Sequence, residues 1–427
     1  MGLINYFARH DWPSVGRLDT WTLGLLFLLP LFAVSVRHWL SALFTVLCLL
    51  GIVNLFRRKN INLEISREEW LLMALLAAFF ISFVLTALSL GWDEHATRAL
   101  GTELRFLLFI PLYLLVRQQR DALMYLAWGC LFAVFLNFFW VAYEVEFLNI
   151  QQVHGVYSSL FVGPITVFFA SVALFVLGGI NYSFARYLPV ALILATGYVA
   201  AYSSRSALLA LVVLSFLYFY TISKKYRLTM LFLTFITVFL VNPFLNSRIQ
   251  TAHSELIAYL SHEFSNESEI NPHGGTSVGV RLEMIKASKF VLQDYPWLGF
   301  GRYGYQEYMS GLVDKGLLNP EVANHGHPHN MLLSALFFKG LFGFLIVILI
   351  FALAFKYFSK ITKDHKSTSL AGLAFLSVLL VTQMTESATL IKGNFISVFL
   401  VFLAVLFASK RHSLQPDMHF TSTISKN

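Results

Sequence analysis

The sequence predicts an all-α polytopic membrane protein. Of its 427 residues, 57% are hydrophobic and only 13% are charged, which is about half the charged fraction usual in soluble globular domains. Apolar runs of about 18 residues or more recur along the chain, and each is long enough to cross a bilayer as a helix. The runs are continuous and lack the alternation of a transmembrane β-barrel.

About twelve transmembrane helices are expected. They fall at about 22–36, 39–56, 70–90, 104–117, 121–143, 158–179, 187–203, 206–223, 228–242, 329–356, 369–388 and 394–409. An even number of crossings places both termini on one side, and the short basic segments at 57–59, 117–120, 224–227 and 356–366 fall on that side. Because short basic loops face the cytoplasm, we expect cytoplasmic termini in a bacterial inner membrane. The net charge of +8 then reflects topology and gives no reason to expect nucleic-acid binding.

Three regions follow from this layout. Residues 1–242 would hold nine membrane helices, 243–328 one large periplasmic loop, and 329–427 three further helices and a cytoplasmic tail. The loop has more acidic than basic residues, so it lacks the cytoplasmic bias. Apolar residues recur at helical spacing from Val280 to Val291, which predicts an amphipathic helix lying against the membrane or the helix bundle.

Three histidines, His325, His327 and His329, stand at the end of the loop in the segment NHGHPHN, directly before an apolar run. Three interpretations are open: zinc ligands, polar residues that begin a helix, or a catalytic or substrate-orienting group. Gly326 and Pro328 oppose a helix that would present His325 and His329 together, and no cysteine is near. A neutral imidazole accepts a proton at neutral pH, which suits a general base acting on a hydroxyl.

Two arginines lie at positions that could form an anion-binding site. Arg205 interrupts a nearly uncharged stretch, which predicts a tight turn on the periplasmic side. An arginine at the bilayer centre costs roughly 2.5–3.5 kcal/mol and less near the interface, so Arg205 either binds an anion or snorkels to lipid headgroups. Arg281 falls in the first turn of the amphipathic helix, where it and free backbone N–H groups would attract phosphate. The alternative is a plain surface arginine.

Arg98 and Arg105 are also expected on the periplasmic side. They either extend a basic pocket or anchor a helix at the membrane interface. The segment PWLGFGRYGYQ is rich in glycine but lacks the strand–loop–helix context of a nucleotide-binding loop. We therefore expect no nucleotide-binding loop here and no cofactor.

Three segments together resemble the conserved segments of bacterial O-antigen ligases. They are SSRSALLAL, GVRLEMIKASKFVLQDYPWLG and HPHNMLLSALFFKGLFG, in this order. In that family a His-Asn pair is followed by nine residues and a glycine, and here His329 and Asn330 are followed by nine residues and Gly340. The twelve-helix layout and the large loop before the tenth helix match as well.

The resemblance implies a glycosyltransferase that moves a glycan from undecaprenyl diphosphate to a sugar hydroxyl of lipid A–core, inverting the anomeric configuration, without metal or ATP. The family's essential histidine falls on His329 and its essential arginines on Arg205 and Arg281, which would bind the diphosphate. His327 and Asn330 would support them. The implied partners are the lipid-linked O-antigen, the lipid A–core acceptor and membrane lipids.

Related functions remain as alternatives. O-antigen polymerases and protein O-oligosaccharyltransferases share the loop and similar motifs. A membrane transporter or flippase would share the helix count, although transporters usually carry related halves and the two halves of this chain are not similar. A metal-dependent hydrolase is a further alternative, and the oligomeric state is open.

Overall fold

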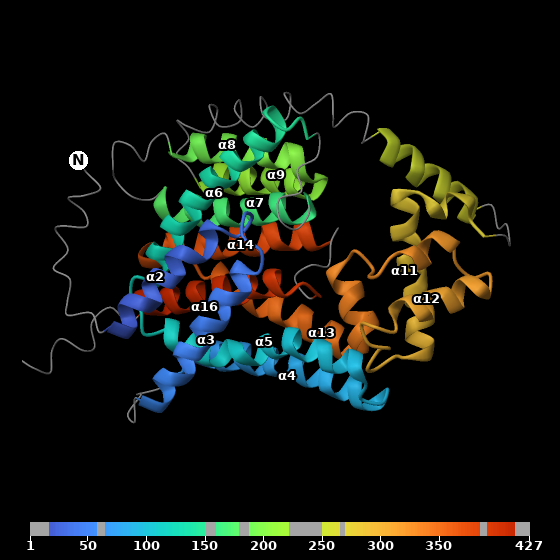
Figure 1. Cartoon of the computed structure of the whole chain (residues 1–427), viewed down its shortest axis with the longest axis horizontal. Coiled ribbons are helices and arrows are strands. Elements are labelled where there is room, and N and C mark those ends of the chain that lie inside the picture. Colours follow the sequence, from blue (N-terminus) through green and yellow to red (C-terminus); the bar gives the residue numbers. More distant parts are fainter. Residues whose placement is uncertain are drawn as a thin grey trace, which may run out of the picture.

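A computed structural model describes residues 17–57, 65–150, 159–178, 188–221, 250–264, 270–384 and 391–414. Throughout these residues the regular secondary structure is helical and no strand occurs, so the prediction of an all-α protein is confirmed. The long helices lie side by side across Figure 1, and a smaller group that includes α11 (Ser277–Asp294) and α12 (Tyr305–Asp314) sits beyond one end of them.

Seven of the described helices are long and apolar enough to cross a membrane. They are α3 (Trp39–Arg57), α4 (Arg67–Ser89), α5 (Glu94–Val116), α6 (Ala122–Glu146), α13 (Met331–Ser359), α14 (Lys366–Gln383) and α16 (Gly393–Leu414). Shorter apolar helices accompany them: α2 (Arg17–Leu31), α7 (Ser159–Leu177), α8 (Leu188–Ser203) and α9 (Arg205–Thr221). The chain is thus a multi-pass membrane protein. The predicted helix at 228–242 lies outside the described residues, so the number of twelve crossings stays a prediction.

The centre of the bundle is α16, which contacts α3, α5, α6 and α14 and is buried from Phe395 to Lys410. Glycines let other helices approach closely. A Cβ atom on Gly51 of α3 would lie 2.3 Å from the carbonyl oxygen of Pro111 in α5. One on Gly129 of α6 would lie 2.2 Å from that of Phe27 in α2. Such contacts are typical of membrane helices, whose association depends on close packing.

One end of the bundle is held together by the buried carboxylate of Glu69. It forms ion pairs with Arg411 at 2.6 Å and Arg117 at 3.8 Å, and it accepts a hydrogen bond from the hydroxyl of Tyr113. Ser66 and Glu69 also cap the start of α4 reciprocally. This Glu69 cluster joins α4, α5 and α16 at the end where the predicted cytoplasmic arginines lie.

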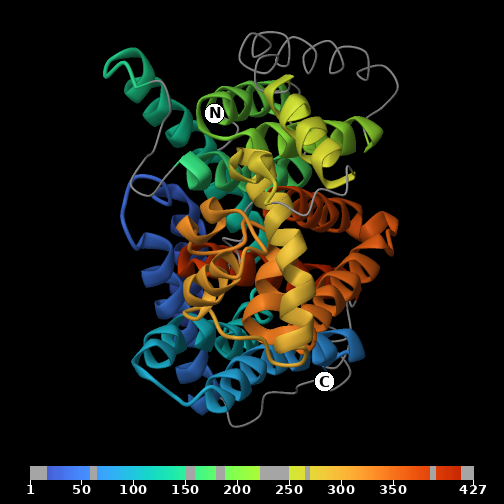
Figure 2. The same cartoon turned by 90° about the vertical axis from the view of Figure 1, so that its right-hand side faces the viewer.

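The opposite end carries a separate apolar cluster. Val280 and Met284 of α11, Met309 of α12 and Phe337 of α13 are buried in it. Figure 2, which looks onto this end, shows the yellow and orange helices of this group lying over the ends of the membrane helices. The apolar face predicted for α11 is confirmed, because it packs against α13.

A kink in α13 ties the two parts together. Gly340 has φ +63° and ψ −164°, outside the helical region. The kink leaves backbone groups of α13 without helical partners, and these groups form hydrogen bonds with the loop before α12. Leu341 N–H donates to the Pro296 oxygen at 2.8 Å, and the Phe337 oxygen accepts from Phe300 N–H at 2.9 Å. A Cβ on Gly340 would lie only 2.2 Å from the loop backbone. Only glycine fits this position, for both φ and space, which explains the glycine of the His-Asn motif.

Candidate active site

The site begins at the cap of α13. The side-chain oxygen of Asn330 accepts hydrogen bonds from Leu332 N–H at 2.9 Å and Leu333 N–H at 3.1 Å, which satisfies two of the N–H groups that open a helix. Its amide group donates to the Met384 oxygen at the end of α14, at 3.1 Å. Asn330 therefore positions the start of α13. The helix begins at Met331, two residues later than predicted, because Asn330 is its cap.

The three histidines lie together in the turn before this cap. His325 Nδ1 is 3.2 Å from His329 Nε2, and His329 N–H donates to His327 Nδ1 at 3.4 Å. His329 has φ +44°, a left-handed conformation that non-glycine residues rarely adopt and that gathers at functional sites. All three side chains are half-buried, so they are held in place but reachable. The spacing that suggested a helical zinc pair instead forms a tight turn.

Arg281 lies within electrostatic reach of these histidines. Burial lowers the pKa of His325, and His329 and Arg281 lower this pKa further, while Glu321 opposes them. The Arg281 guanidinium donates to the backbone and hydroxyl oxygens of Ser277 at 2.9 and 3.2 Å. The structure thus brings Arg281 within electrostatic reach of His325, the hydrogen-bond partner of His329.

The start of α11 differs from the prediction in one respect. The N–H groups expected to be free for an anion are already bonded: Val278 N–H donates to Glu255 at 3.1 Å and Gly279 N–H donates to the Thr276 hydroxyl at 3.0 Å. That expectation is wrong for these two groups. Any anion bound here would rely on the Arg281 side chain.

A buried polar network fixes α11 to the segment before the histidines. The Glu283 carboxylate accepts from the Tyr259 hydroxyl at 2.8 Å and from Asn319 N–H at 3.1 Å. Asn271 donates to the Tyr259 oxygen at 3.0 Å, and the Asn319 amide donates to the Asn271 oxygen at 3.0 Å. Asn319 caps the short helix η3 (Pro320–Asn324), which directly precedes His325. The network therefore sets the position of Arg281 relative to the histidines.

Arg205 begins α9 directly after a one-residue break. α8 ends at Ser203, and only Ser204 separates the two helices. The Ser204 hydroxyl accepts from Ala207 N–H at 3.3 Å, so the serine caps α9. Arg205 is exposed. The predicted tight turn is confirmed.

Packing places this turn at the same end of the bundle as the histidines. Gly163, near the start of α7, lies directly against Ser203, and Phe161, two residues earlier, packs against Phe395 near the start of α16. Just before α16, the backbone oxygen of Ile391 accepts a 3.0 Å hydrogen bond from Arg302, in the loop before α12.

Comparison with known proteins agrees with this picture. Residues 190–348 match the sequence model of a family described as O-antigen ligase. This match supports the O-antigen ligase family for this part of the chain. The matched span contains Arg205, Arg281, the three histidines and the kink at Gly340. An uncharacterized protein of Haemophilus influenzae is 26% identical over 341 residues, which cover 75% of this chain and 80% of that protein. Members of the O-antigen ligase family are glycosyltransferase-like enzymes that act on O-antigen.

The two other arginines predicted to lie on the periplasmic side have ordinary contacts. Arg98 forms an ion pair with Glu94 one turn earlier on α5, and both side chains are exposed. Arg105 is half-buried; it donates to the Ser397 hydroxyl at 3.2 Å and lies 6.0 Å from the Phe44 ring centroid. Arg105 thus joins α5 to α16, and neither arginine lines the cavity described next.

A cavity of about 630 Å³, which the sequence does not predict, lies between α4, α5, α12 and the loop before α12. Glu103 and Lys339 form a buried ion pair at its wall, 2.7 Å apart. The sequence indicates that each of these two residues has a charged partner, because each interrupts an apolar helix and such charges usually pair. It does not indicate that they pair with each other, because they are far apart along the chain.

Proposed function

We propose that the chain is an O-antigen ligase that transfers a glycan from undecaprenyl diphosphate to a sugar hydroxyl of lipid A–core, at the periplasmic face of the inner membrane. The observation that supports this best is the contact of His329 with His325 at the start of α13, with Arg281 in electrostatic reach. The transfer needs such a pairing, because it removes a proton from the acceptor and releases a negatively charged diphosphate.

In this proposal His329 is the general base. Its Nε2–H donates to Nδ1 of His325, and Nδ1 of His329 takes the proton of the acceptor hydroxyl. The lowered pKa of His325 keeps His325 neutral at pH 7. A neutral neighbour that accepts a hydrogen bond stabilises the imidazolium that forms on His329, whereas a charged one would oppose it.

Bond making and breaking then follow from the substrates. As the proton passes to His329, the acceptor oxygen bonds to the anomeric carbon, and the bond from that carbon to the diphosphate oxygen breaks. The diphosphate leaves with the electron pair, attached to its lipid, and attack from the opposite face inverts the anomeric configuration. Arg281 and Arg205 would donate forked hydrogen bonds to the diphosphate and stabilise its growing charge. The sugar–diphosphate bond is already activated, so the proposed step uses neither ATP nor a metal ion.

The position of the site suits substrates that are anchored in lipid. The histidine turn joins directly to a helix that is long and apolar enough to span the membrane. A headgroup that diffuses in the bilayer can therefore reach the turn sideways while its lipid chains stay in the membrane.

A reconstitution experiment tests the proposal. The purified chain, in liposomes, receives lipid-linked glycan together with rough lipopolysaccharide, or lipid-linked glycan alone, each with and without chelator. Glycan attached to lipopolysaccharide, unaffected by chelator, is the expected result. Elongation of the lipid-linked glycan without lipopolysaccharide would instead identify a polymerase. Loss of transfer in chelator would contradict the metal-independent mechanism.

A further inference from the structure

We propose that the cavity between α4, α5 and α12 binds sugar residues of a glycan substrate, as a subsite apart from the histidine turn. The inference rests on the proposed function, which supplies glycans as the ligand class. Its volume, about 630 Å³, is within the range of small-molecule sites, and it opens at the same end of the bundle as the proposed base.

The charges on its wall favour a neutral polar ligand over an anion. Three carboxylates and three cations line it: Asp93, Glu103, Glu307, Arg302, Lys315 and Lys339. A diphosphate would meet the carboxylates, and like charges repel one another. Sugar hydroxyls both donate and accept hydrogen bonds, so they can bond to the carboxylates and to the cations. The equal number of positive and negative side chains distinguishes the cavity from the arginine and histidine groups proposed to bind the diphosphate.

Aromatic rings supply the apolar surface that a sugar ring needs. Tyr303 stacks on His95 with ring centroids 4.9 Å apart, and Tyr308 stacks on Phe300 at 4.6 Å. Tyr303 is 43% exposed, so one side of this stacked pair remains accessible. Tyrosine joins a flat apolar face to a polar tip, which matches a sugar with its apolar C–H faces and hydroxyl edges.

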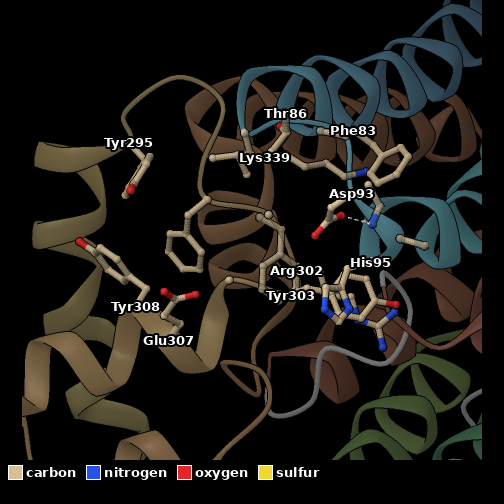
Figure 3. Close-up of a pocket in the computed structure, with 18 of the residues that line it drawn as sticks. Phe83, Thr86, Asp93, His95, Tyr295, Arg302, Tyr303, Glu307, Tyr308 and Lys339 are labelled. Carbon is tan, nitrogen blue, oxygen red and sulfur yellow. Dashed lines mark hydrogen bonds between the residues drawn. The ribbon is translucent and has the colours of Figure 1, made fainter.

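Polar groups on the wall can reach a ligand. Figure 3 shows Glu307 and Tyr308 on one side of the cavity, His95 and Asp93 on the other, and Arg302 between them. The Glu307 side chain forms no hydrogen bond or ion pair with the described residues. Arg302 has five N–H donors, and one of them bonds to the Ile391 oxygen.

The cavity is built from fixed parts. The Thr86 hydroxyl near the end of α4 donates to the Leu298 oxygen at 2.6 Å, which holds the loop of Gly301, Arg302 and Tyr303 against α4. The same loop is bonded to the kink in α13 through Phe300. A site formed before binding loses less entropy when a ligand enters.

One helix relates the cavity to the proposed base. Lys339 lines the cavity and lies eight residues after Met331, where α13 begins behind the histidine turn. At about 1.5 Å per residue, the two points are about 12 Å apart along the helix. A short oligosaccharide can extend over this distance, so a glycan whose reacting sugar is at His329 could place later sugars in the cavity.

Titration calorimetry on the full chain in detergent tests the inference. The probes are lipid-free core oligosaccharide and lipid-free O-antigen glycan, measured separately. Wild type should bind one of them, and Tyr303→Ala and Glu307→Gln should each weaken that binding about tenfold. Gln306→Ala is the matched control, because Gln306 is exposed on α12 beside Glu307 but does not line the cavity. The probe that loses affinity identifies the acceptor or the donor as the source of the sugar.

Two results would overturn the inference: wild type binding neither glycan, or both variants binding as tightly as wild type. His329→Ala, which removes the proposed base, should bind the glycan normally. Sugar binding and glycan transfer therefore fail separately, and a failed transfer assay would not be mistaken for a failed subsite.

Discussion

Two polar clusters stand at opposite ends of this helix bundle, and they are built differently. At one end, the Glu69 carboxylate is fully buried and is paired with Arg411, Arg117 and Tyr113. At the other end, the histidine turn is half-buried, and His329 has a left-handed backbone.

The difference separates a structural role from a functional one. A buried charge that lacks a partner in the native state destabilises the fold. Groups that handle protons and charged substrates must instead remain reachable and be held in the required geometry. Both clusters contain titratable groups, but only the histidine turn meets the second condition. Substitutions should therefore affect folding at one end and chemistry at the other.

The largest effect on folding is expected from Glu69→Ala. It leaves Arg411 and Arg117 without their buried partner, which should cost about 3–5 kcal/mol. Glu68→Ala is the matched control, because its ion pair with Lys360 is exposed and is worth about 1 kcal/mol or less. Thermal unfolding in detergent measures both, and transfer per folded molecule should remain normal. Equal unfolding temperatures for the two variants would contradict a stabilising role of the Glu69 cluster.

At the other end, Arg281→Ala should reduce transfer about 10²-fold, as expected when a group that stabilises developing charge is lost. Arg281→Lys should lower the transfer rate about tenfold, because the point charge of an ammonium group does not replace the two forked hydrogen bonds of a planar guanidinium. Unfolding should hardly change, since Arg281 is exposed and its hydrogen bonds within the described residues go to Ser277, one turn earlier on the same helix. Arg98→Ala is the control for removing an exposed arginine. Equal loss in Arg98→Ala and Arg281→Ala would remove the specific role of Arg281.

A smaller effect is expected from His325→Ala, which removes the hydrogen-bond partner of His329. Loss of one such bond should lower the transfer rate about tenfold. The pKa of His325 is lowered by burial, so His325 stays neutral until the pH falls below its usual value of about 6.5. The wild-type rate should therefore be constant above about pH 6.5 and fall as His325 takes up a proton below it. A wild-type rate that rises as the pH falls through this range would contradict a neutral His325.

Much of the fold could be predicted because apolar run length decides which segments form membrane helices. Helix ends could not, because single polar residues set them. The prediction began α5 at 104, after its charged turns, whereas the helix begins at Glu94. The Asp93 carboxylate caps it by accepting from Ala96 N–H at 2.7 Å, and the charged first turns continue the helix beyond the apolar part.

The site could be predicted only where its residues lie close together in the sequence. The short segment from His325 to His329 could be recognised as one unit because its three histidines lie within five residues. The kink at Gly340 could not be derived, because the loop from Pro296 to Phe300 causes it from elsewhere in the sequence. The Glu103–Lys339 pair was missed for the same reason, although each charge stood out within its own helix.

Transfer by His329→Ala in liposomes, with unfolding measured on the same preparation, tests the central claim most directly. The account predicts a fall in the transfer rate of at least about 10²-fold, the usual contribution of a general base, with an unfolding temperature close to that of wild type. Transfer at the wild-type rate from a correctly folded His329→Ala chain would show that the chemistry takes place elsewhere.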